Sequence, residues 1–328
     1  MLSRMPVAVS ILGTGSILPS RCVPAEDLDA QLRLPPGTTL ARNGVATRYF
    51  AAPEESSSGL GAAALRQALA HAGREPADLD AILFASVLAE QPMPTTSILI
   101  HRQIGGRAAG VTCFDLNASC NGFLKLLEIA AAGIHAGQWR HVGIVAAELG
   151  SRGLNWDDLD TCTLFGDGAA AAVLGPSNGS AGILASHSVT RSEGLDHCRI
   201  PAGGTRYNVR QPPPTETDYF FAMNGRGLLR LIQEHFPPFL EELLHAHPVS
   251  LVVPHQASAI GLAFLAKQLR PRRIPHVDIL AEVGNQVTAS LPTALHHAFS
   301  QGLCRPGEAS LLVGTAAGVS LSGLVIRH

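Results

Sequence analysis

Residues 111–130, VTCFDLNASCNGFLKLLEIA, join a short apolar segment to a longer, mostly apolar one. The first part, residues 111–116, has the length and the β-branched and aromatic content of a short buried strand. The second part, from Phe123 to Ala130, is typical of a mostly buried helix. Cys120 therefore stands where a strand ends and a helix begins.

The same alternation of strands and helices recurs along the chain. Residues 60–72 predict a helix, with Leu65 and Leu69 on one face and Gly73 as its stop. The predicted strands are residues 81–85, 142–146 and 251–253. This alternation predicts an α/β fold, in which parallel or mixed sheets are covered by helices on both faces.

Proline and glycine interrupt this pattern in three places. Pro237-Pro238 predicts that the helical region 227–244 divides into two short helices. The glycine- and proline-rich segment at about 198–219 predicts an irregular loop, either a flap over a substrate or a surface loop. The run Gly175-Pro176-Ser177-Asn178-Gly179 lies near the middle and divides the chain into two halves.

Cys120 is a candidate nucleophile because of its position before a helix. A thiol there faces unpaired backbone N–H groups and the positive end of the helix dipole, and both favour the thiolate. Gly122 allows a substrate or another segment to approach the backbone closely. The alternative is a buried structural cysteine, which is the ordinary role of a lone cysteine.

Two distant residues favour the catalytic interpretation of Cys120. His255 follows the predicted strand 251–253, and Asn285 follows Gly284 in a loop. A Cys, a His and an Asn at the ends of elements form a constellation for acyl chemistry at a thioester or amide carbon. A papain-like protease also uses these residue types, but its C-G-[SA]-C-[WY] signature is absent around Cys120.

Composition restricts the class of protein. The chain has 328 residues, of which 46% are hydrophobic and 15% charged, so it can bury a large core. A net charge of −2 argues against nucleic acid as the main partner. Arg4 and the apolar run 6–12 could be mistaken for a signal peptide, but no A-x-A cleavage site follows, and we interpret the run as a first strand. No apolar stretch is long enough to span a membrane.

The cysteines and histidines indicate no metal site. The six cysteines show no CxxC or Cys/His pairing typical of zinc. We expect reduced thiols in a cytoplasmic protein, five of them structural. The cysteines are Cys22, Cys113, Cys120, Cys162, Cys198 and Cys304.

Five segments together resemble the β-ketoacyl-acyl-carrier-protein synthase III family, whose members are condensing enzymes of the thiolase superfamily. They surround Cys120, His255 and Asn285 and include Phe165-Gly166-Asp167-Gly168-Ala169 and Val313-Gly314-Thr315-Ala316-Ala317-Gly318. The resemblance spans nearly the whole chain. It implies a thiolase-like five-layer αβαβα sandwich of two similar halves, which we place at residues 1–178 and 179–328.

The resemblance also implies a reaction. Cys120 would accept an acyl group, with the oxyanion held by the backbone N–H groups of Cys120 and Ala317. His255 and Asn285 would stabilise the enolate formed when malonyl-acyl-carrier-protein loses CO₂. The expected activity is that of an acyltransferase performing a decarboxylative Claisen condensation in fatty-acid or related biosynthesis, with thioester substrates and no cofactor.

Two other functions remain open at this stage. Relatives of this fold sometimes pass the acyl group from the cysteine to an alcohol or amine without decarboxylation. A non-catalytic partner subunit of a condensing enzyme is a third possibility, which the presence of Cys120, His255 and Asn285 disfavours.

The resemblance further implies substrate and partner contacts. We expect Arg42, Met93, Met223, Gly225 and Ser258 to contact substrate, with Met93 reaching across the interface of a homodimer. For Met93 the alternative is a loop methionine packed on its own subunit. The basic run containing Lys267 and Arg270 is a candidate docking site for the acyl carrier protein, although a solvated basic face is the commoner meaning of such a run.

Three positions depart from the family pattern for holding coenzyme A. Thr38 stands where relatives carry a tryptophan, and Leu159 and Ile260 stand where they carry arginines, whereas Arg42 is retained. Aliphatic residues cannot replace arginine where stacking or phosphate pairing is needed. This predicts weakened binding of the coenzyme A nucleotide, with a primer carried by acyl carrier protein or bound through the pantetheine arm.

Overall fold

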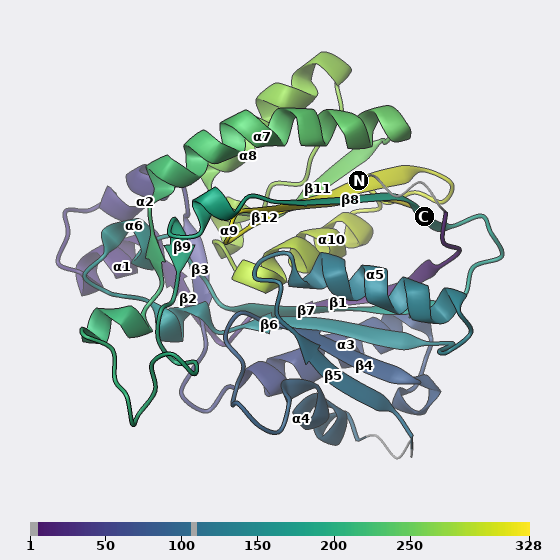
Figure 1. Cartoon of the computed structure of the whole chain (residues 1–328), viewed down its shortest axis with the longest axis horizontal. Coiled ribbons are helices and arrows are strands. Elements are labelled where there is room, and N and C mark those ends of the chain that lie inside the picture. The colour runs from purple at the N-terminus through teal and green to yellow at the C-terminus, as the bar shows by residue number, and fades with distance from the viewer. Residues whose placement is uncertain (1–5, 106–109) are drawn as a thin grey trace.

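The computed structural model describes residues 6–105 and 110–328, and Arg4 of the N-terminal run lies outside them. Two mixed sheets dominate the structure (Figure 1). The first has the strand order β1-β7-β6-β4-β5, and the second has the order β11-β12-β13-β8. The first comprises β1 Ser10–Ile17, β4 Ala81–Ala85, β5 Thr112–Leu116, β6 Val142–Glu148 and β7 Gly168–Gly175. The second comprises β8 Gly182–Thr190, β11 Leu251–Pro254, β12 Ala309–Ala316 and β13 Ser320–Arg327.

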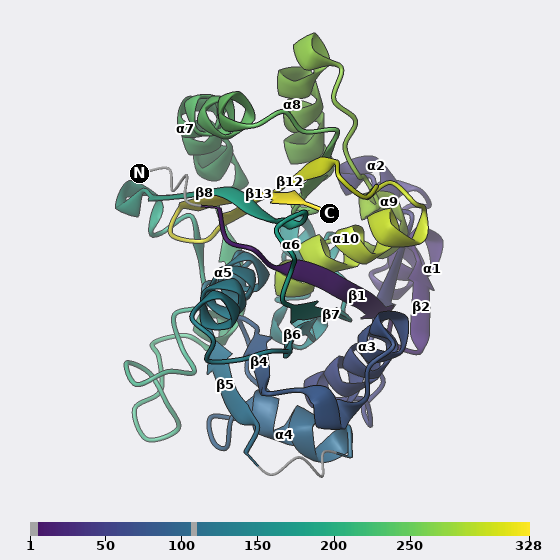
Figure 2. The ribbon, with the colours of Figure 1, turned by 90° about the vertical axis from the view of Figure 1, so that its right-hand side faces the viewer.

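Helices cover both faces of each sheet. Helices α5 (Gly122–His135) and α10 (Ser290–Ser300) lie between the two sheets (Figure 2). Their apolar residues join strands of both sheets in one core cluster. Helices α3 (Ser57–Ala72) and α4 (Thr96–Gln103) cover the outer face of the first sheet, and α7 (Gly225–Ala246) and α8 (Ala259–Leu269) that of the second. The result is the predicted five-layer αβαβα sandwich.

Shorter elements frame the ends of the strands. A small hairpin pairs β2 (Arg21–Pro24) with β3 (Thr47–Phe50), and a second pairs β9 (Cys198–Arg199) with β10 (Ala222–Met223). The remaining α-helices are α1 Ala25–Gln31, α2 Thr38–Asn43, α6 Leu159–Cys162 and α9 Leu280–Val283. Single turns of 3₁₀-helix lie at Pro76–Asp78, Gly150–Gly153, Ser192–Gly194, Glu216–Tyr219, Arg270–Arg272 and Val287–Ala289.

Most of the predicted elements are present, with longer bounds. Strand β4 matches its prediction and is buried at every position. Helix α3 begins at Ser57, three residues before the predicted start, because the Ser56 side chain caps the N–H of Gly59. It ends as predicted at Gly73, which adopts the left-handed conformation that glycine permits.

Three sequence-based interpretations need correction. The N-terminal strand β1 begins at Ser10 and runs to Ile17, so it lies later than the apolar run 6–12. Strand β5 is half-exposed, not buried, because it lies at the edge of the first sheet. Helix α7 is continuous through Pro237 and Pro238.

Packing explains why α7 remains helical at its two prolines. Each proline removes one backbone hydrogen bond from the helix. The same stretch buries Phe236, Phe239 and Leu243 in the core cluster that joins α7 to the second sheet. Burial of this face of α7 therefore offsets the free-energy cost of the hydrogen bonds lost at the two prolines. A prediction from the prolines alone overestimates their effect on the helix.

The division of the chain at residues 178 and 179 remains a prediction. It is supported by the connection between Gly175 and Gly182, which leads from the last strand of the first sheet to the first strand of the second.

Candidate active site

Cys120 lies in a tight turn between β5 and α5. Ser119, just before it, has a φ of 50°, a conformation that non-glycine residues rarely adopt. The Asn117 side chain stabilises this turn by accepting the Ser119 N–H at 2.9 Å, and Gly122 N–H donates to the Ser119 carbonyl at 2.9 Å. Strained backbone held by surrounding contacts is typical of functional turns.

Gly122 allows this turn to pack tightly, as its sequence position suggested. A Cβ at Gly122 would lie 2.8 Å from the Cβ of Ala85, at the end of β4, and 3.0 Å from Cγ2 of Thr288. Any larger residue would push α5 and Cys120 away from the carboxyl end of the first sheet.

His255 follows β11 and is 6% exposed. Its backbone N–H donates to the Val313 carbonyl at 2.8 Å, which fixes it beside β12. Among the described residues, no group partners its buried Nδ1 atom. Burial lowers the pKa of His255 to about 4, so the ring is a neutral imidazole at physiological pH.

Asn285 is held by backbone and side-chain hydrogen bonds. Its N–H donates to the Leu164 carbonyl at 3.0 Å, next to the predicted Phe165-Gly166-Asp167 motif. Its Oδ1 accepts the Val287 N–H at 2.8 Å and the Ser290 hydroxyl at 3.2 Å. Its Nδ2 donates to the Ala257 carbonyl at 3.0 Å. The Nδ2 group carries a second hydrogen, which remains available to a ligand.

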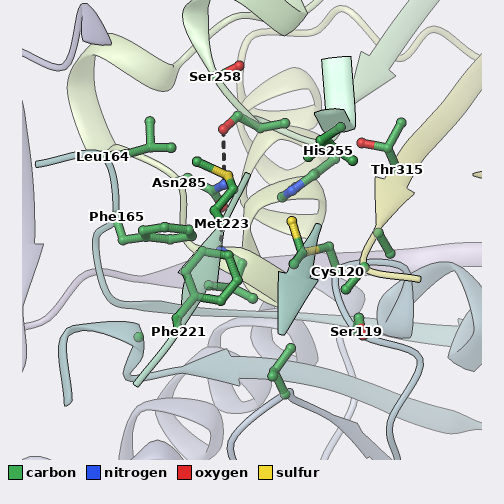
Figure 3. A pocket seen from close by; sticks show the side chains of 18 of the residues that line it. Ser119, Cys120, Leu164, Phe165, Phe221, Met223, His255, Ser258, Asn285 and Thr315 are labelled. Atoms are coloured by element: carbon green, nitrogen blue, oxygen red, sulfur yellow. Dashed lines mark hydrogen bonds between the residues drawn. The ribbon is translucent and has the colours of Figure 1, made fainter. Parts of the chain in front are cut away.

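The three predicted catalytic residues line one cavity of about 1960 Å³. Figure 3 shows the Cys120 thiol and the His255 ring directed toward one another, with Asn285 lining the same cavity. They come from three separate elements: the α5 turn, the loop after β11 and the loop after α9. The structure therefore brings together residues that lie far apart in the sequence, from Cys120 to Asn285.

The Cys120 pKa differs from the sequence-based expectation. Burial, followed by the nearby Cys198 and Glu148, raises the pKa of the thiol to about 12. The helix N-terminus does not outweigh the loss of solvation. The resting site thus pairs a neutral thiol with a neutral imidazole.

Ala317 is suited to the predicted second position of the oxyanion hole. It lines the same cavity, just after β12. Gly318 has a φ of 128°, whereas Ala317 is not among the residues with a positive φ. An alanine at position 317 therefore does not require the left-handed conformation that favours glycine.

Most predicted substrate contacts also line the cavity. They are Arg42, Met223, Gly225 and Ser258. Ser258 additionally caps α8 by accepting the Gly261 N–H at 3.1 Å. Arg42 is already paired, since its Nε and Nη2 atoms donate to Asp160 Oδ1 at 2.8 and 2.6 Å.

Three predicted residues lie away from the cavity lining. Met93 is 84% exposed, so the alternative in which it packs on its own subunit is wrong for the single chain. Lys267 and Arg270 lie at the end of α8 opposite Ser258, near an ion pair between Arg272 and Glu241.

The loop at 198–219 is not merely a surface loop, because its first part, residues 198–204, contributes to the cavity.

Sequence reasoning missed two residues that support the site. Glu148, at the end of β6, is fully buried and accepts the N–H groups of Val87 and Leu88 at 2.9 Å each. Burial raises its pKa to about 7. Ser290 binds the Asn285 amide, as described above. A carboxylate at the end of an apolar strand was the available signal for Glu148, whereas nothing local distinguishes Ser290.

Comparisons with known proteins place this site in a family. A family model described as 3-oxoacyl-(acyl-carrier-protein) synthase III matches residues 114–192, and a model of its C-terminal part matches residues 241–328. A β-ketoacyl-(acyl-carrier-protein) synthase III of Roseiflexus castenholzii is 33% identical, with 97% of each chain covered. The chain belongs to this family. It is an acyl-transferring condensing enzyme, and the papain-like alternative is excluded.

Other relatives of the synthase III family agree with this assignment. An acetoacetyl CoA synthase of a Streptomyces species is 34% identical, with 98% of this chain and 99% of that protein covered. A solved 3-oxoacyl-(acyl-carrier-protein) synthase III of Aquifex aeolicus has a TM-score of 0.86 and 28% identity, covering 98% of this chain and 100% of that chain. The thiolase-type sandwich therefore extends over essentially the whole molecule.

Proposed function

We propose that this enzyme condenses an acyl thioester primer with malonyl-acyl-carrier-protein through an acyl-Cys120 intermediate. The observation that carries the proposal is the convergence of Cys120, His255 and Asn285 on one cavity. The product is a β-ketoacyl thioester.

In the first half-reaction, Sγ of Cys120 attacks the thioester carbon of the primer. A C–S bond forms to Cys120, the bond to the carrier sulfur breaks, and the thiol proton leaves with the carrier thiol. Backbone N–H groups of Cys120 and Ala317 stabilise the oxyanion, and one such donor is typically worth about 10²–10³ in rate.

In the second half-reaction, the malonyl group loses CO₂ and the electron pair of the broken C–C bond forms an enolate. Neutral His255 donates from its ring N–H, and Asn285 donates its second amide hydrogen, to the enolate oxygen. The enolate carbon attacks acyl-Cys120, and the released thiolate takes up a proton.

The charges at the mouth of the cavity favour a primer whose binding does not depend on the coenzyme A nucleotide. Asp160 neutralises Arg42, and Ile260 is 65% exposed at the cavity edge where relatives carry an arginine. Phosphate groups therefore lack a free cation at these two positions. We expect acyl-acyl-carrier-protein, or coenzyme A bound through its pantetheine arm, as the primer. A low micromolar Michaelis constant for acetyl-coenzyme A would contradict this.

The active assembly is proposed to be a homodimer. Strand β5 is paired on one side only within the described residues, and it is half-exposed at the sheet edge. Nearby, Ile98 of α4 is 45% exposed and Met93 is 84% exposed. An unpaired edge with exposed apolar side chains favours association with a second copy.

Carrier-protein docking and location in the cell are further parts of the proposal. Lys267 and Arg270 provide cationic groups for an acidic carrier protein. All six cysteines are free, which favours a reducing, cytoplasmic compartment. No helix in residues 6–105 or 110–328 is long and apolar enough to cross a membrane.

Release of ¹⁴CO₂ from carboxyl-labelled malonyl-acyl-carrier-protein tests the proposed reaction. We expect release that requires a primer thioester and is lost in Cys120→Ala. Acyl transfer to an alcohol or amine without CO₂ release would support the acyltransferase alternative. Absence of both activities would indicate a non-catalytic partner subunit.

A further inference from the structure

The two proposed oxyanion donors belong to segments that are far apart in the chain. The N–H of Cys120 lies in the turn before α5, whereas that of Ala317 lies in the turn between β12 and β13. An oxyanion hole is effective only when both donors lie about 2.7–3.1 Å from the same oxygen atom. A contact that holds these two turns together therefore bears on the reaction.

Asn121 makes such a contact. Its Nδ2 group donates to the Ser320 carbonyl at 3.3 Å and to the Ser320 hydroxyl at 3.2 Å. Asn121 directly follows Cys120, and Ser320 is the first residue of β13. Ser320 also pairs with Ala316, the residue before Ala317. One side chain thus joins the turn of the nucleophile to the pair of strands that carries the second donor.

The Asn121 side chain does not have the usual role of an asparagine at this position. It is the N-cap residue of α5, where asparagine ordinarily accepts an N–H group of the first helical turn, but its side chain makes no capping hydrogen bond. The residue is 1% exposed, and within the described residues its buried Oδ1 atom has no partner. An unpartnered buried acceptor costs free energy, so stability alone does not account for this asparagine.

The second sheet accommodates this amide closely. A Cβ at Gly314 of β12 would lie 2.5 Å from Asn121 Oδ1, so only glycine leaves enough room there. The turn after β12 is held at a second point, because Val319 and Arg191 exchange two backbone hydrogen bonds of 2.7 Å. The turn is therefore fixed at Val319 by the segment after β8 and at Ser320 by Asn121.

We infer that Asn121 is a positioning residue for the oxyanion hole, which sets the separation between the N–H groups of Cys120 and Ala317 by binding Ser320. The inference rests on the proposed function, in which both groups stabilise the oxyanion formed when the thioester is attacked. Asn121 lies outside the cavity lining, so it acts through these neighbours and does not touch the substrate.

Two reactions of Cys120 separate positioning from general damage. Acylation by acetyl- or octanoyl-N-acetylcysteamine passes through an oxyanion, whereas alkylation by iodoacetamide displaces iodide from a saturated carbon and forms none. Mass spectrometry of the peptide that contains Cys120 measures both in wild type and in Asn121→Leu, whose side chain has a similar shape but cannot hydrogen-bond. We expect Asn121→Leu to lose about tenfold in acylation rate, the effect of about one net hydrogen bond. Its alkylation rate should equal that of wild type.

Ser188→Ala is the matched control. Lys125 of α5 donates to the Ser188 hydroxyl of β8 at 2.5 Å, so this variant removes another contact between α5 and the second sheet, one helical turn from Asn121. It should leave both rates unchanged. Asn121→Ala covers the case in which Asn121→Leu does not fold, and it should show the same selective loss of acylation.

The outcomes distinguish the inference from the proposed function. Wild-type acylation rates in the Asn121 variants, or equal slowing of acylation and alkylation, would overturn the inference alone. Failure of both Asn121 variants to fold would assign the residue to stability and overturn it as well. Absence of Cys120 acylation in wild type by every donor would overturn the proposed function and the inference with it.

Discussion

Ser290 sets the direction in which the Asn285 amide faces. Its hydroxyl donates to Asn285 Oδ1 at 3.2 Å, and its oxygen accepts the Gln286 N–H at 2.7 Å. With Oδ1 occupied in this way, the Nδ2 group is directed to Ala257 and to the cavity. Ser290 is therefore a positioning residue for the enolate donor.

Replacing Ser290 by alanine should affect one half-reaction. We expect Ser290→Ala to lower the rate of malonyl decarboxylation roughly five- to tenfold, the effect of losing about one net hydrogen bond. Cys120 acylation by the primer should be unchanged, because Asn285 acts after that step. Single-turnover kinetics separate the two steps, and Ser300→Ala, at an exposed site on the same helix, is the control. Equal slowing of both steps would indicate general damage to the site instead.

The pH dependence of Cys120 reactivity follows from its burial. A pKa of about 12 means that the thiolate fraction rises about tenfold per pH unit throughout the neutral range. Alkylation of Cys120 by iodoacetamide should therefore accelerate steadily from pH 7 to 9 without a plateau. Cys120→Ala provides the background from the other thiols. A plateau near neutral pH would mean that the helix N-terminus stabilises the thiolate more than burial opposes it.

At the scale of elements, α7 shows where local and tertiary preferences conflict. Pro238 is exposed in the middle of this helix, and it leaves the Glu234 carbonyl without its helical N–H donor. Pro238→Ala restores that donor and should stabilise the protein by about 1–3 kcal/mol. Thermal unfolding measures the effect. A lower melting temperature would show that Pro238 instead stabilises α7, by restricting the unfolded chain.

The same comparison shows what the sequence could predict. Strand β4 and the stop of α3 at Gly73 were predicted correctly, because apolar runs and left-handed glycine caps are local signals. The exposure of β5 and the continuity of α7 were not, since they depend on sheet order and on burial of Phe236 and Phe239. Cys120, His255 and Asn285 could be nominated because each follows an element end, but their shared cavity emerges only from the fold.

At the scale of the whole molecule, the edge of the first sheet determines the proposed assembly. Light scattering should give twice the 34.3 kDa mass of the chain. Ile98→Glu places a charge on the exposed apolar surface of α4 and should shift the protein toward monomer. Leu303→Glu is the matched control, since Leu303 is 41% exposed away from this edge. A monomeric wild type, or equal effects of both variants, would contradict the proposed dimer surface.

The central claim is that Cys120 carries the acyl group during condensation. Intact-protein mass spectrometry tests it most directly, after mixing wild type and Cys120→Ala with acyl-coenzyme A and acyl-acyl-carrier-protein donors of several lengths. We predict a single acyl adduct on wild type, greater with carrier-protein donors, and none on Cys120→Ala. An adduct that persists in Cys120→Ala, or no adduct with any donor, would contradict the account.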